Sequence, residues 1–568
     1  MARIAIDPIT RIEGHLRIEA EVTSGKVADA WSSGTMFRGL EMILRERDPR
    51  DAWMFAQRAC GVCTTVHALA SVRAVENALG IVIPENARLV RNLIAGTQFL
   101  HDHVIHFYHL HALDWVDVVS ATKADPAKTS TLAQSISAWP KSSTDYFKGI
   151  QSRLNAFVGT GQLGPFANGY WGHPAYTLEP EANLLAVAHY LEALEWQRDI
   201  VRIHAVLGGK NPHPQTYAVG GMALRMAPDS PTGLNSTSMA QIKTMLANAR
   251  TFVDQVLIPD VTLVAGAYKS WFSIGKGIGN YMVYGDFTDQ TGDAKTNMFP
   301  AGRILGRNLG RVESLDHQKI SETVAHSYYE YEGDDTAGKH PWKGETNPKY
   351  QGPNPPFETL EGFDRYSWLK APRYDGQAME VGPLARVLVA YAAKQAEVVK
   401  AVDGLLSKLS LQPADLMSTM GRIAARALET QLLVPHLESW LGTLEKNMNS
   451  GNLAVADSKK WNPDSWPKEA EGVGFEEAPR GALGHWVVIK DKKIANYQLV
   501  VPSTWNGSPR DAKGQRGAWE EALLETPIAD PEKPVEVLRT VHSFDPCMAC
   551  AVHVYDPAGG SSVQVRVV

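Results

Sequence analysis

The spacing of apolar residues predicts that most of this chain is helical. Between residues 92 and 121, apolar side chains recur every three or four positions, which is the period of a helix with one buried face. The same spacing predicts helices at 183–207, 238–256, 384–409 and 413–447. Several of these segments exceed the usual length of a globular helix, and none carries a heptad repeat. Long helices of this kind indicate a bundle.

Alternating apolar and polar positions predict strands at both ends of the chain. The segments near the start are 3–6, 15–22 and 27–31, with a turn at 24–26, and those near the end are 485–490 and 494–501, with a turn at 491–493. From about 275 to 382 the chain is rich in Gly, Pro, Lys, Asp and aromatic residues, which predicts extended loops and short strands laid over the bundle.

The expected fold class is therefore α+β and predominantly α, with a long-helix bundle as the core and small peripheral β-sheets built from the N- and C-terminal regions. The expected divisions are an N-terminal β region (1–50), a first part of the helical bundle (51–270), a loop-rich covering region (271–382), a second part of the bundle (383–450), a C-terminal β region (451–553) and a C-terminal extension (554–568).

The composition is that of an ordinary globular protein. The 568 residues are 44% hydrophobic and 21% charged, and the net charge is -6. Because binding to phosphates needs a basic face, we expect no nucleic-acid partner. We find no apolar run of about 18 residues and no signal peptide after Met1, so we expect a chain that neither spans a membrane nor is exported by its own signal.

All four cysteines lie in two short segments at opposite ends of the chain, each a C-x-x-C motif followed by a histidine. A chain this long does not need disulfide staples, so metal or redox chemistry is the better interpretation. Four thiolates in one site can hold a structural zinc ion, a four-iron cluster or a soft-liganded transition metal such as nickel. The residues concerned are Cys60, Cys63 and His67 in the first segment, and Cys547, Cys550 and His553 in the second.

The neighbours of the cysteines weaken the zinc interpretation. A structural zinc usually crosslinks a small domain, whereas these cysteine pairs come from the two ends of a long chain. Arg58 and Asp545 each lie two residues before a pair, which is typical of residues that support metal ligands. Thiolates also bridge metals, so four of them can hold a binuclear centre whose remaining ligands come from outside the protein.

Taken together, the motifs resemble those of the large subunit of the nickel-iron hydrogenases. They are Arg-Ile-Glu-Gly-His at 11–15, the first cysteine segment at 58–67, Ala-Pro-Arg-Gly at 478–481 and the second cysteine segment at 545–553. Stretches at 34–41, 167–174 and 208–214 are most similar to the membrane-associated uptake group. The resemblance covers essentially the whole chain, and both cysteine motifs in this order are highly specific.

The resemblance implies a binuclear metal centre and its reaction. Cys60 and Cys547 would be terminal nickel ligands, and Cys63 and Cys550 would bridge nickel to an iron that carries carbon monoxide and two cyanides. The implied reaction is the reversible heterolytic cleavage of H2, in which the metals take the hydride, a nearby base takes the proton and two electrons leave one at a time.

The resemblance also assigns roles around the metals. Glu13 would relay protons beside Cys547, although a surface carboxylate at a strand end is the alternative interpretation. Arg480 would lie over the open metal site with Asp102 and Asp545 as its partners, chiefly as an electrostatic group, and whether it also takes the first proton stays open. An ordinary helix salt bridge is the alternative interpretation for Asp102. Further implied groups are Pro479, Val501, Pro502 and Ser503 around the diatomic ligands, His67 as a donor to a bridging sulfur, and Glu41, the Leu499 carbonyl and His553 as ligands of a magnesium ion.

Two other patterns have plainer interpretations. The histidines of 101–111 lie on several faces of one predicted helix, so we interpret them as packing, solvation or subunit contacts rather than as one metal site. The glycine pattern at 275–279 lacks the P-loop spacing and is interpreted as a loop.

The resemblance further implies a precursor and a set of partners. Fifteen residues, 554–568, follow His553, and a maturation protease would remove them once nickel is bound. The chain lacks cysteines for electron-carrying clusters, so an iron-sulfur small subunit is expected, in a heterodimer or a dimer of heterodimers. A membrane cytochrome b-type subunit is also expected. The expected location is the periplasmic side of the cytoplasmic membrane, reached on the export signal of the partner.

Two rival functions stay open from the sequence. One is a non-enzymatic assembly protein stabilised by zinc. The other is the hydrogenase-like large subunit of a proton-pumping complex, in which the cysteine pairs and the 11–15 motif are altered or lost. This chain retains all four thiols, which argues against the second rival.

Overall fold

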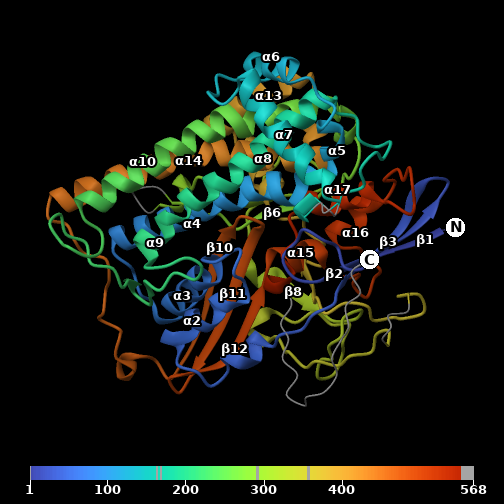
Figure 1. Cartoon of the computed structure of the whole chain (residues 1–568). Coiled ribbons are helices and arrows are strands. Elements are labelled where there is room, and N and C mark those ends of the chain that lie inside the picture. Colours follow the sequence, from blue (N-terminus) through green and yellow to red (C-terminus); the bar gives the residue numbers. More distant parts are fainter. Residues whose placement is uncertain (1, 162–163, 167–168, 289–292, 355–358, 552–568) are drawn as a thin grey trace.

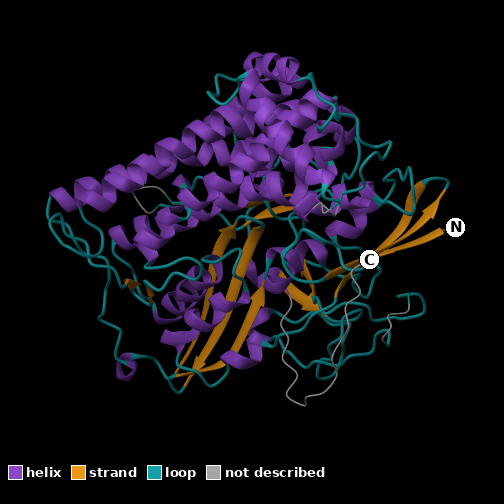
Figure 2. Ribbon diagram, viewed as in Figure 1, coloured by secondary structure: helices purple, strands orange, loops and turns teal. Residues whose placement is uncertain are grey.

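The computed structural model describes residues 2–161, 164–166, 169–288, 293–354 and 359–551. About 47% of the chain is helical, and the strands form small antiparallel sheets, so the predicted α+β, mainly helical class is confirmed. The long helices gather above the C-terminal sheet, while the N-terminal sheet lies at one edge (Figures 1 and 2).

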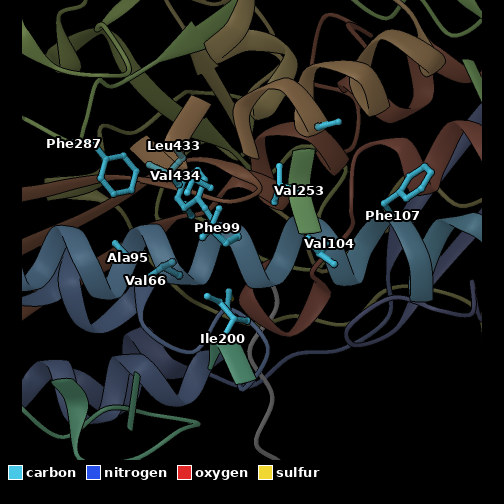
Figure 3. Close-up of a cluster of buried hydrophobic side chains, with 14 of the residues drawn as sticks. Val66, Ala95, Phe99, Val104, Phe107, Ile200, Val253, Phe287, Leu433 and Val434 are labelled. Atoms are coloured by element: carbon cyan, nitrogen blue, oxygen red, sulfur yellow. The ribbon is translucent and has the colours of Figure 1, made fainter. Parts of the chain in front are cut away.

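The central helix is α4 (Glu85–Ile105), which packs along α14 (Thr419–Asn449). Figure 3 shows Phe99 of α4 beside Leu433 and Val434 of α14, members of the largest buried apolar cluster. The helices around this pair are α8 (Pro180–Ile200), α9 (Arg202–Gly208), α10 (Ser236–Phe252), α11 (Ile258–Ala267), α12 (Pro383–Ala392) and α13 (Ala396–Leu409).

The predicted single helix over 92–121 is interrupted, which corrects the sequence interpretation. Helix α4 ends at Ile105, a π-helical segment follows at His106–His111, and α5 is only Val118–Ala121. The wider turn directs two imidazoles onto α17 (Val535–Ser543): His106 Nε2 lies 2.6 Å from the His542 carbonyl, and His111 Nε2 lies 3.1 Å from the Arg539 carbonyl. Tertiary hydrogen bonds therefore override the helical period.

Other predicted helices also divide. The segment 384–409 is two helices, α12 and α13, because Lys394 adopts a left-handed conformation between them with φ of 64°. The segment 183–207 is divided between α8 and α9, and α10 continues through a π-helical turn at Val253–Leu257 into α11. The segment 413–447 contains a 3-10 turn at Pro413–Leu416 before α14.

The N-terminal sheet forms as predicted. Its strands are antiparallel in the order β1 (Ala2–Ile6), β2 (Leu16–Thr23) and β3 (Lys26–Gly34). Apolar side chains on one face, such as Leu16 and Ile18, pack with Trp519 of α16 (Ala518–Leu523) and with α17. This sheet therefore joins the start of the chain to the segment that precedes the second cysteine motif.

The C-terminal sheet contains one strand more than the sequence predicted. Strand β10 (Glu469–Ala478) pairs with β11 (Gly481–Lys490), which pairs with β12 (Lys493–Val500). Its position corrects the expectation of a peripheral sheet, because β11 is buried along most of its length. Helix α3 (Val66–Leu79) covers one face, and the other face packs against the loop-rich region.

The loop-rich region between the helical segments carries short hairpins and, at 275–279, the loop that the sequence predicted. Its strands are β6 (Tyr281–Val283) with β7 (Gly302–Ile304), and β8 (Ile320–Thr323) with β9 (Ala371–Tyr374). The remaining elements are α1 (Leu40–Leu44), α2 (Ala52–Ala56), α6 (Pro126–Ile136), α7 (Thr144–Gly159), β4 (Tyr217–Ala218), β5 (Gly221–Met222), α15 (Pro502–Gly507) and α18 (Met548–Ala551). None of the helices in the described part of the chain combines the length and the apolar character needed to cross a membrane.

Candidate metal centre

The four cysteines meet at one buried point between the two ends of the chain. Cys60 and Cys63 lie just before α3, and Cys547 and Cys550 lie at and within α18. Their sulfur atoms all lie within 4.8 Å of one another, and all four thiols are free. The Sγ–Sγ distances are 2.7 Å for Cys63–Cys550, 3.0 Å for Cys547–Cys550, 3.5 Å for Cys60–Cys547 and 3.9 Å for Cys63–Cys547.

The chemistry of these thiols fits a metal centre. Burial raises the pKa of Cys63 and Cys550 well above the usual value, so the protein alone does not stabilise four thiolates. Burial acts in the same direction on Cys60, but hydrogen bonds with the neighbouring thiols outweigh it and lower that pKa. The backbone N–H groups of Val62 and Cys63 also donate to Cys60 Sγ, at 3.3 and 3.2 Å. Several positive charges among the sulfurs would compensate a buried group of thiolates, and soft transition metals supply them.

Glu13 lies beside the second cysteine pair because the N-terminal segment passes directly over α18. The Met548 N–H donates to the Glu13 carbonyl at 2.7 Å, and the Ala549 N–H donates to Glu13 Oε2 at 2.9 Å. The Cys547 thiol lies 3.6 Å from the same carboxylate oxygen. Gly14, with φ of 83°, permits this close approach, because a Cβ there would lie 2.6 Å from the Ala549 nitrogen.

The environment of Glu13 favours its protonated form. Burial is the largest cause, the negative charge of Cys547 adds to it, and together they raise the pKa of Glu13 to about 8 despite the hydrogen bond from Ala549. A carboxyl group that titrates near neutral pH can take up and release a proton. The alternative of an ordinary surface carboxylate does not fit this partly buried position.

Arg480 is held over the thiols by two carboxylates. Its guanidinium donates to Asp102 Oδ2 at 2.9 Å and to Asp545 Oδ1 at 3.1 Å, and all three side chains are buried. Burial alone would lower the pKa of Arg480, but the charges of Asp545 and Asp102 outweigh it and raise that pKa further. The guanidinium is therefore a fixed positive charge.

A small cavity lies between Arg480 and the thiols. Ser503 lines it, and the Ser503 Oγ accepts a hydrogen bond of 3.0 Å from the Cys547 N–H, which leaves the hydroxyl proton available to a group in the cavity. Pro479 is buried behind the lining, and its carbonyl accepts a hydrogen bond from Arg386 at 2.8 Å. The lining consists of Cys63, Val66, His67, Ala478, Arg480, Leu483, Val501, Pro502, Ser503, Cys547 and Cys550.

The predicted magnesium ligands are placed in part. The Leu499 N–H donates to Glu41 Oε1 at 3.0 Å, so these two residues lie together, whereas His553 falls outside the described residues. The sequence did not indicate Lys370, whose ammonium lies 3.3 Å from Glu41 Oε2 and 3.9 Å from Glu322 Oε2. Buried carboxylates and a carbonyl are the ligands that a hard cation such as magnesium prefers.

The histidines of 101–111 have separate partners. The Nε2 atoms of His101, His103 and His109 lie 3.1 Å from Gln197 Oε1, 2.7 Å from Glu429 Oε1 and 3.1 Å from the Tyr190 carbonyl, respectively. Among the described residues, the four cysteines form the one group of three or more Cys, His, Asp or Glu side chains that meets metal-ligand geometry. The interpretation of these histidines as packing and contact residues therefore agrees with their geometry.

One functional position missed by the sequence reasoning is His485. It lies between Leu483 and Val487 on the face of β11 that points toward α3, and its Nε2 is 3.0 Å from His67 Nδ1. The available signal was a histidine at an inward position of an otherwise apolar strand. Lys370 and Glu322 gave no such signal, because they lie in the loop-rich region without a periodic pattern.

Comparisons with known proteins agree with this geometry. The family model described as nickel-dependent hydrogenase matches residues 38–553, and one described as HoxL-like matches residues 3–33. The uptake hydrogenase large subunit of Bradyrhizobium diazoefficiens is 53% identical, and the hydrogenase-1 large chain of Escherichia coli is 50% identical, each match covering 100% of this chain and 97% of the relative. The Ni-Fe-Se hydrogenase of Desulfovibrio vulgaris Hildenborough in its oxidised state superposes with a TM-score of 0.76 at 36% identity, over 97% of this chain and 100% of that chain.

Proposed function

This chain belongs to the nickel-dependent hydrogenase family as the catalytic large subunit of a nickel-iron hydrogenase, and from that premise we propose how its residues divide the work of H2 oxidation. The observation that carries the proposal is the convergence of four buried free thiols with Glu13 and Arg480. When bound, the nickel-iron centre supplies the cleavage of H2 into a proton and a hydride equivalent and accepts two electrons.

We assign the four cysteines to the two metals as the family resemblance implies. Cys63 and Cys550 would be the bridging ligands, and Cys60 and Cys547 would be terminal ligands of nickel. The shortest sulfur separation, 2.7 Å, is between Cys63 and Cys550, which suits two sulfurs that share both metals. The iron would carry carbon monoxide and two cyanides. Val501 and Pro502 supply an apolar wall for these diatomic ligands, and the Ser503 hydroxyl donates to a cyanide.

We assign proton transfer to Glu13. Its carboxylate receives a proton from the Cys547 side, 3.6 Å away, and releases it into a second cavity that Glu13 lines together with Gly61, Thr64 and His101. A pKa of about 8 keeps the proton-loaded and proton-free forms close in free energy near neutral pH.

We assign Arg480 an electrostatic role. Because Asp102 and Asp545 orient its guanidinium at 2.9 and 3.1 Å, it presents fixed donors to the cavity, where it orients H2 and donates to a cyanide. Its raised pKa argues against a role as the first proton acceptor. Asp102 and Asp545 are positioning residues that act through Arg480.

Glu41, the Leu499 carbonyl and His553 are proposed to hold magnesium, which ties the C-terminal segment to the body of the protein. The extension 554–568 is proposed to be removed by a maturation protease, and the match to the family model, which stops at residue 553, supports that boundary. We propose that the segment that carries Cys547 and Cys550, which are buried in the described structure, opens to admit the metals before cleavage.

The electrons leave to an iron-sulfur small subunit in a heterodimer, and from there to a membrane cytochrome b-type subunit. The complex is placed on the periplasmic side of the membrane as a peripheral assembly exported on the signal of its partner. Support comes from the identity of about 50% to uptake hydrogenase large subunits over the full chain.

The test is H2 oxidation by the purified complex with an artificial electron acceptor, together with metal analysis. We expect nickel and iron in the protein, infrared bands of carbon monoxide and cyanide, and loss of activity and nickel in Cys547→Ser. Zinc with a silent infrared window would support the assembly-protein alternative instead.

A further inference from the structure

A chain of four buried polar side chains leads away from the thiol cavity. His67 Nδ1 lies 3.0 Å from His485 Nε2, and His485 Nδ1 lies 2.8 Å from the Tyr497 hydroxyl. The Tyr497 hydroxyl lies 2.9 Å from the Ser71 hydroxyl, and either hydroxyl can be the donor because each rotates about its C–O bond. At the inner end, His67 lines the cavity with the cysteines, and its Nε2 is buried with no hydrogen-bond partner among the described residues.

The fold places these groups in line without contributions from loops. His67 and Ser71 are one turn apart on α3, and both point toward the sheet. His485 lies on β11, and Tyr497 lies on β12 opposite Val487, so the two side chains are diagonal neighbours on one face of the sheet. All four residues are 1% exposed or less, so bulk water does not compete for these hydrogen bonds.

The chain of hydrogen bonds has two possible directions. In one, Ser71 donates to Tyr497, Tyr497 donates to His485 Nδ1, and His485 Nε2–H donates to His67 Nδ1. His67 then carries its proton on Nε2. In the other direction every donor becomes an acceptor, and His67 presents a bare nitrogen lone pair to the cavity. Because Nδ1 accepts from His485 in the first direction and donates to it in the second, the single proton of a neutral His67 lies on Nε2 or on Nδ1, respectively.

The sulfurs of the metal centre favour one of the two directions of the hydrogen-bond chain. A bare nitrogen facing metal-bound thiolates would be a buried acceptor opposite other acceptors, which costs free energy, whereas an N–H facing a thiolate makes a charge-assisted hydrogen bond. Donation from His67 to a sulfur of the centre is already implied by the family resemblance. We propose that Ser71, Tyr497 and His485 are positioning residues that fix the proton of His67 on Nε2, the tautomer that this donation requires. The inference rests on the proposed metal centre, because thiolates rather than thiols select the direction.

The hydrogen bond from His67 would change the reduction potential of the metal centre. A hydrogen bond to a metal-bound sulfur withdraws negative charge from it, and this raises the reduction potential of the centre. Ser71, whose hydroxyl lies three hydrogen bonds from the cavity, thereby influences the metals without touching them.

The test is 15N NMR of the nickel-loaded complex, labelled at histidine nitrogen, in a state without unpaired electrons. The His67 signals are assigned by their loss in His67→Asn. We expect a protonated Nε2 and a bare Nδ1 in the wild type. In Tyr497→Phe we expect the His67 signals to shift toward a mixture of the two tautomers and the reduction potential of the centre to fall. Ser71→Ala should shift the His67 signals and the reduction potential in the same direction, but by less. His485→Gln should retain the wild-type His67 signals, because the glutamine amide both donates and accepts.

Tyr268→Phe is the matched control. The Tyr268 hydroxyl is also buried and makes two hydrogen bonds, to the Trp115 carbonyl at 2.6 Å and from the Thr177 N–H at 3.0 Å, but it does not belong to the chain. This control should shift neither the His67 signals nor the potential. A wild-type His67 with its proton on Nδ1 would overturn the assigned direction, and unchanged His67 signals in both Tyr497→Phe and Ser71→Ala would overturn the positioning role. Failure of the proposed function would differ, because the wild type would then hold no nickel and oxidise no H2.

Discussion

Glu13→Gln isolates proton transfer from the rest of the centre. Glutamine keeps the size of the side chain and an oxygen that accepts the Ala549 N–H, now 2.9 Å from Glu13 Oε2, so the contact between the N-terminal segment and α18 is retained. It removes the titratable proton. With a pKa of about 8, the Glu13 carboxyl is mostly protonated at pH 7 but loses its proton at modest cost, and glutamine has no equivalent.

The expected loss follows from that role. A positioned acid or base contributes about 10²- to 10⁴-fold in rate, so H2 oxidation should fall by that factor, which corresponds to about 3–5 kcal/mol in the barrier. Nickel content and thermal stability should stay at the wild-type level. The assay is H2 oxidation with an artificial acceptor, measured alongside nickel content and the melting temperature.

Glu536→Gln provides the matched control, because Glu536 Oε1 also accepts a backbone N–H, from Ala529 at 3.1 Å, and its other carboxylate oxygen lacks a hydrogen-bond partner among the described residues. It should retain wild-type turnover. A Glu13→Gln enzyme with full nickel content and wild-type turnover would refute the relay assignment, and equal losses in both variants would point to a general structural effect.

Three further predictions concern stability and maturation. Gly14→Ala should destabilise the protein and lower its nickel content, because the left-handed conformation costs about 1–2 kcal/mol and the new Cβ would lie 2.6 Å from the Ala549 nitrogen. Gly80→Ala is the control, since Gly80 has φ of 62° and no atom lies within 4 Å of its Cβ. In the same melting experiment this control should show only the cost of the left-handed conformation. Burial raises the pKa of Glu520 from 4.5 to about 7, so the folded state holds this proton more tightly and the free energy of unfolding should fall by up to about 3 kcal/mol as the pH rises across that window. Chemical denaturation at several pH values should show a weaker fall of the unfolding free energy with pH in Glu520→Gln than in the wild type. An equal fall in both proteins would contradict the raised pKa of Glu520. Mass spectrometry of the active enzyme should find a chain that ends at His553, whereas full activity with the extension retained would exclude cleavage as a requirement.

The sequence predicted the fold class because periodicity survives in most elements, and it failed where tertiary hydrogen bonds override the period. The segment 92–121 reads as one helix, yet His106 and His111 bond to carbonyls of α17, which lies more than 400 positions further along the chain. Strand β10 was missed, although it pairs along its full length with β11. Its glycines and paired glutamates at 472–477 hide the alternation that marks a strand.

The motifs predicted which residues of the candidate site meet, and their roles stay predictions. The cysteine pairs and the motifs around Glu13 and Arg480 are local patterns, and their residues meet within hydrogen-bonding distance. Groups that act through others were not predictable. Ser71 and Tyr497 are ordinary helix and strand residues in the sequence, and only the packing of α3 on the C-terminal sheet brings them into line with His485. A role that depends on which way the donors point along a chain of hydrogen bonds leaves no motif in the sequence.

The most direct test of the central claim is X-ray absorption at the nickel edge of the purified complex. Nickel bound by Cys60, Cys63, Cys547 and Cys550 predicts a first shell dominated by sulfur at about 2.3 Å, the usual metal–thiolate distance, with iron as a more distant neighbour. In Cys60→Ser the sulfur contribution should fall. Nickel surrounded by nitrogen and oxygen alone, or zinc in place of nickel, would contradict the account.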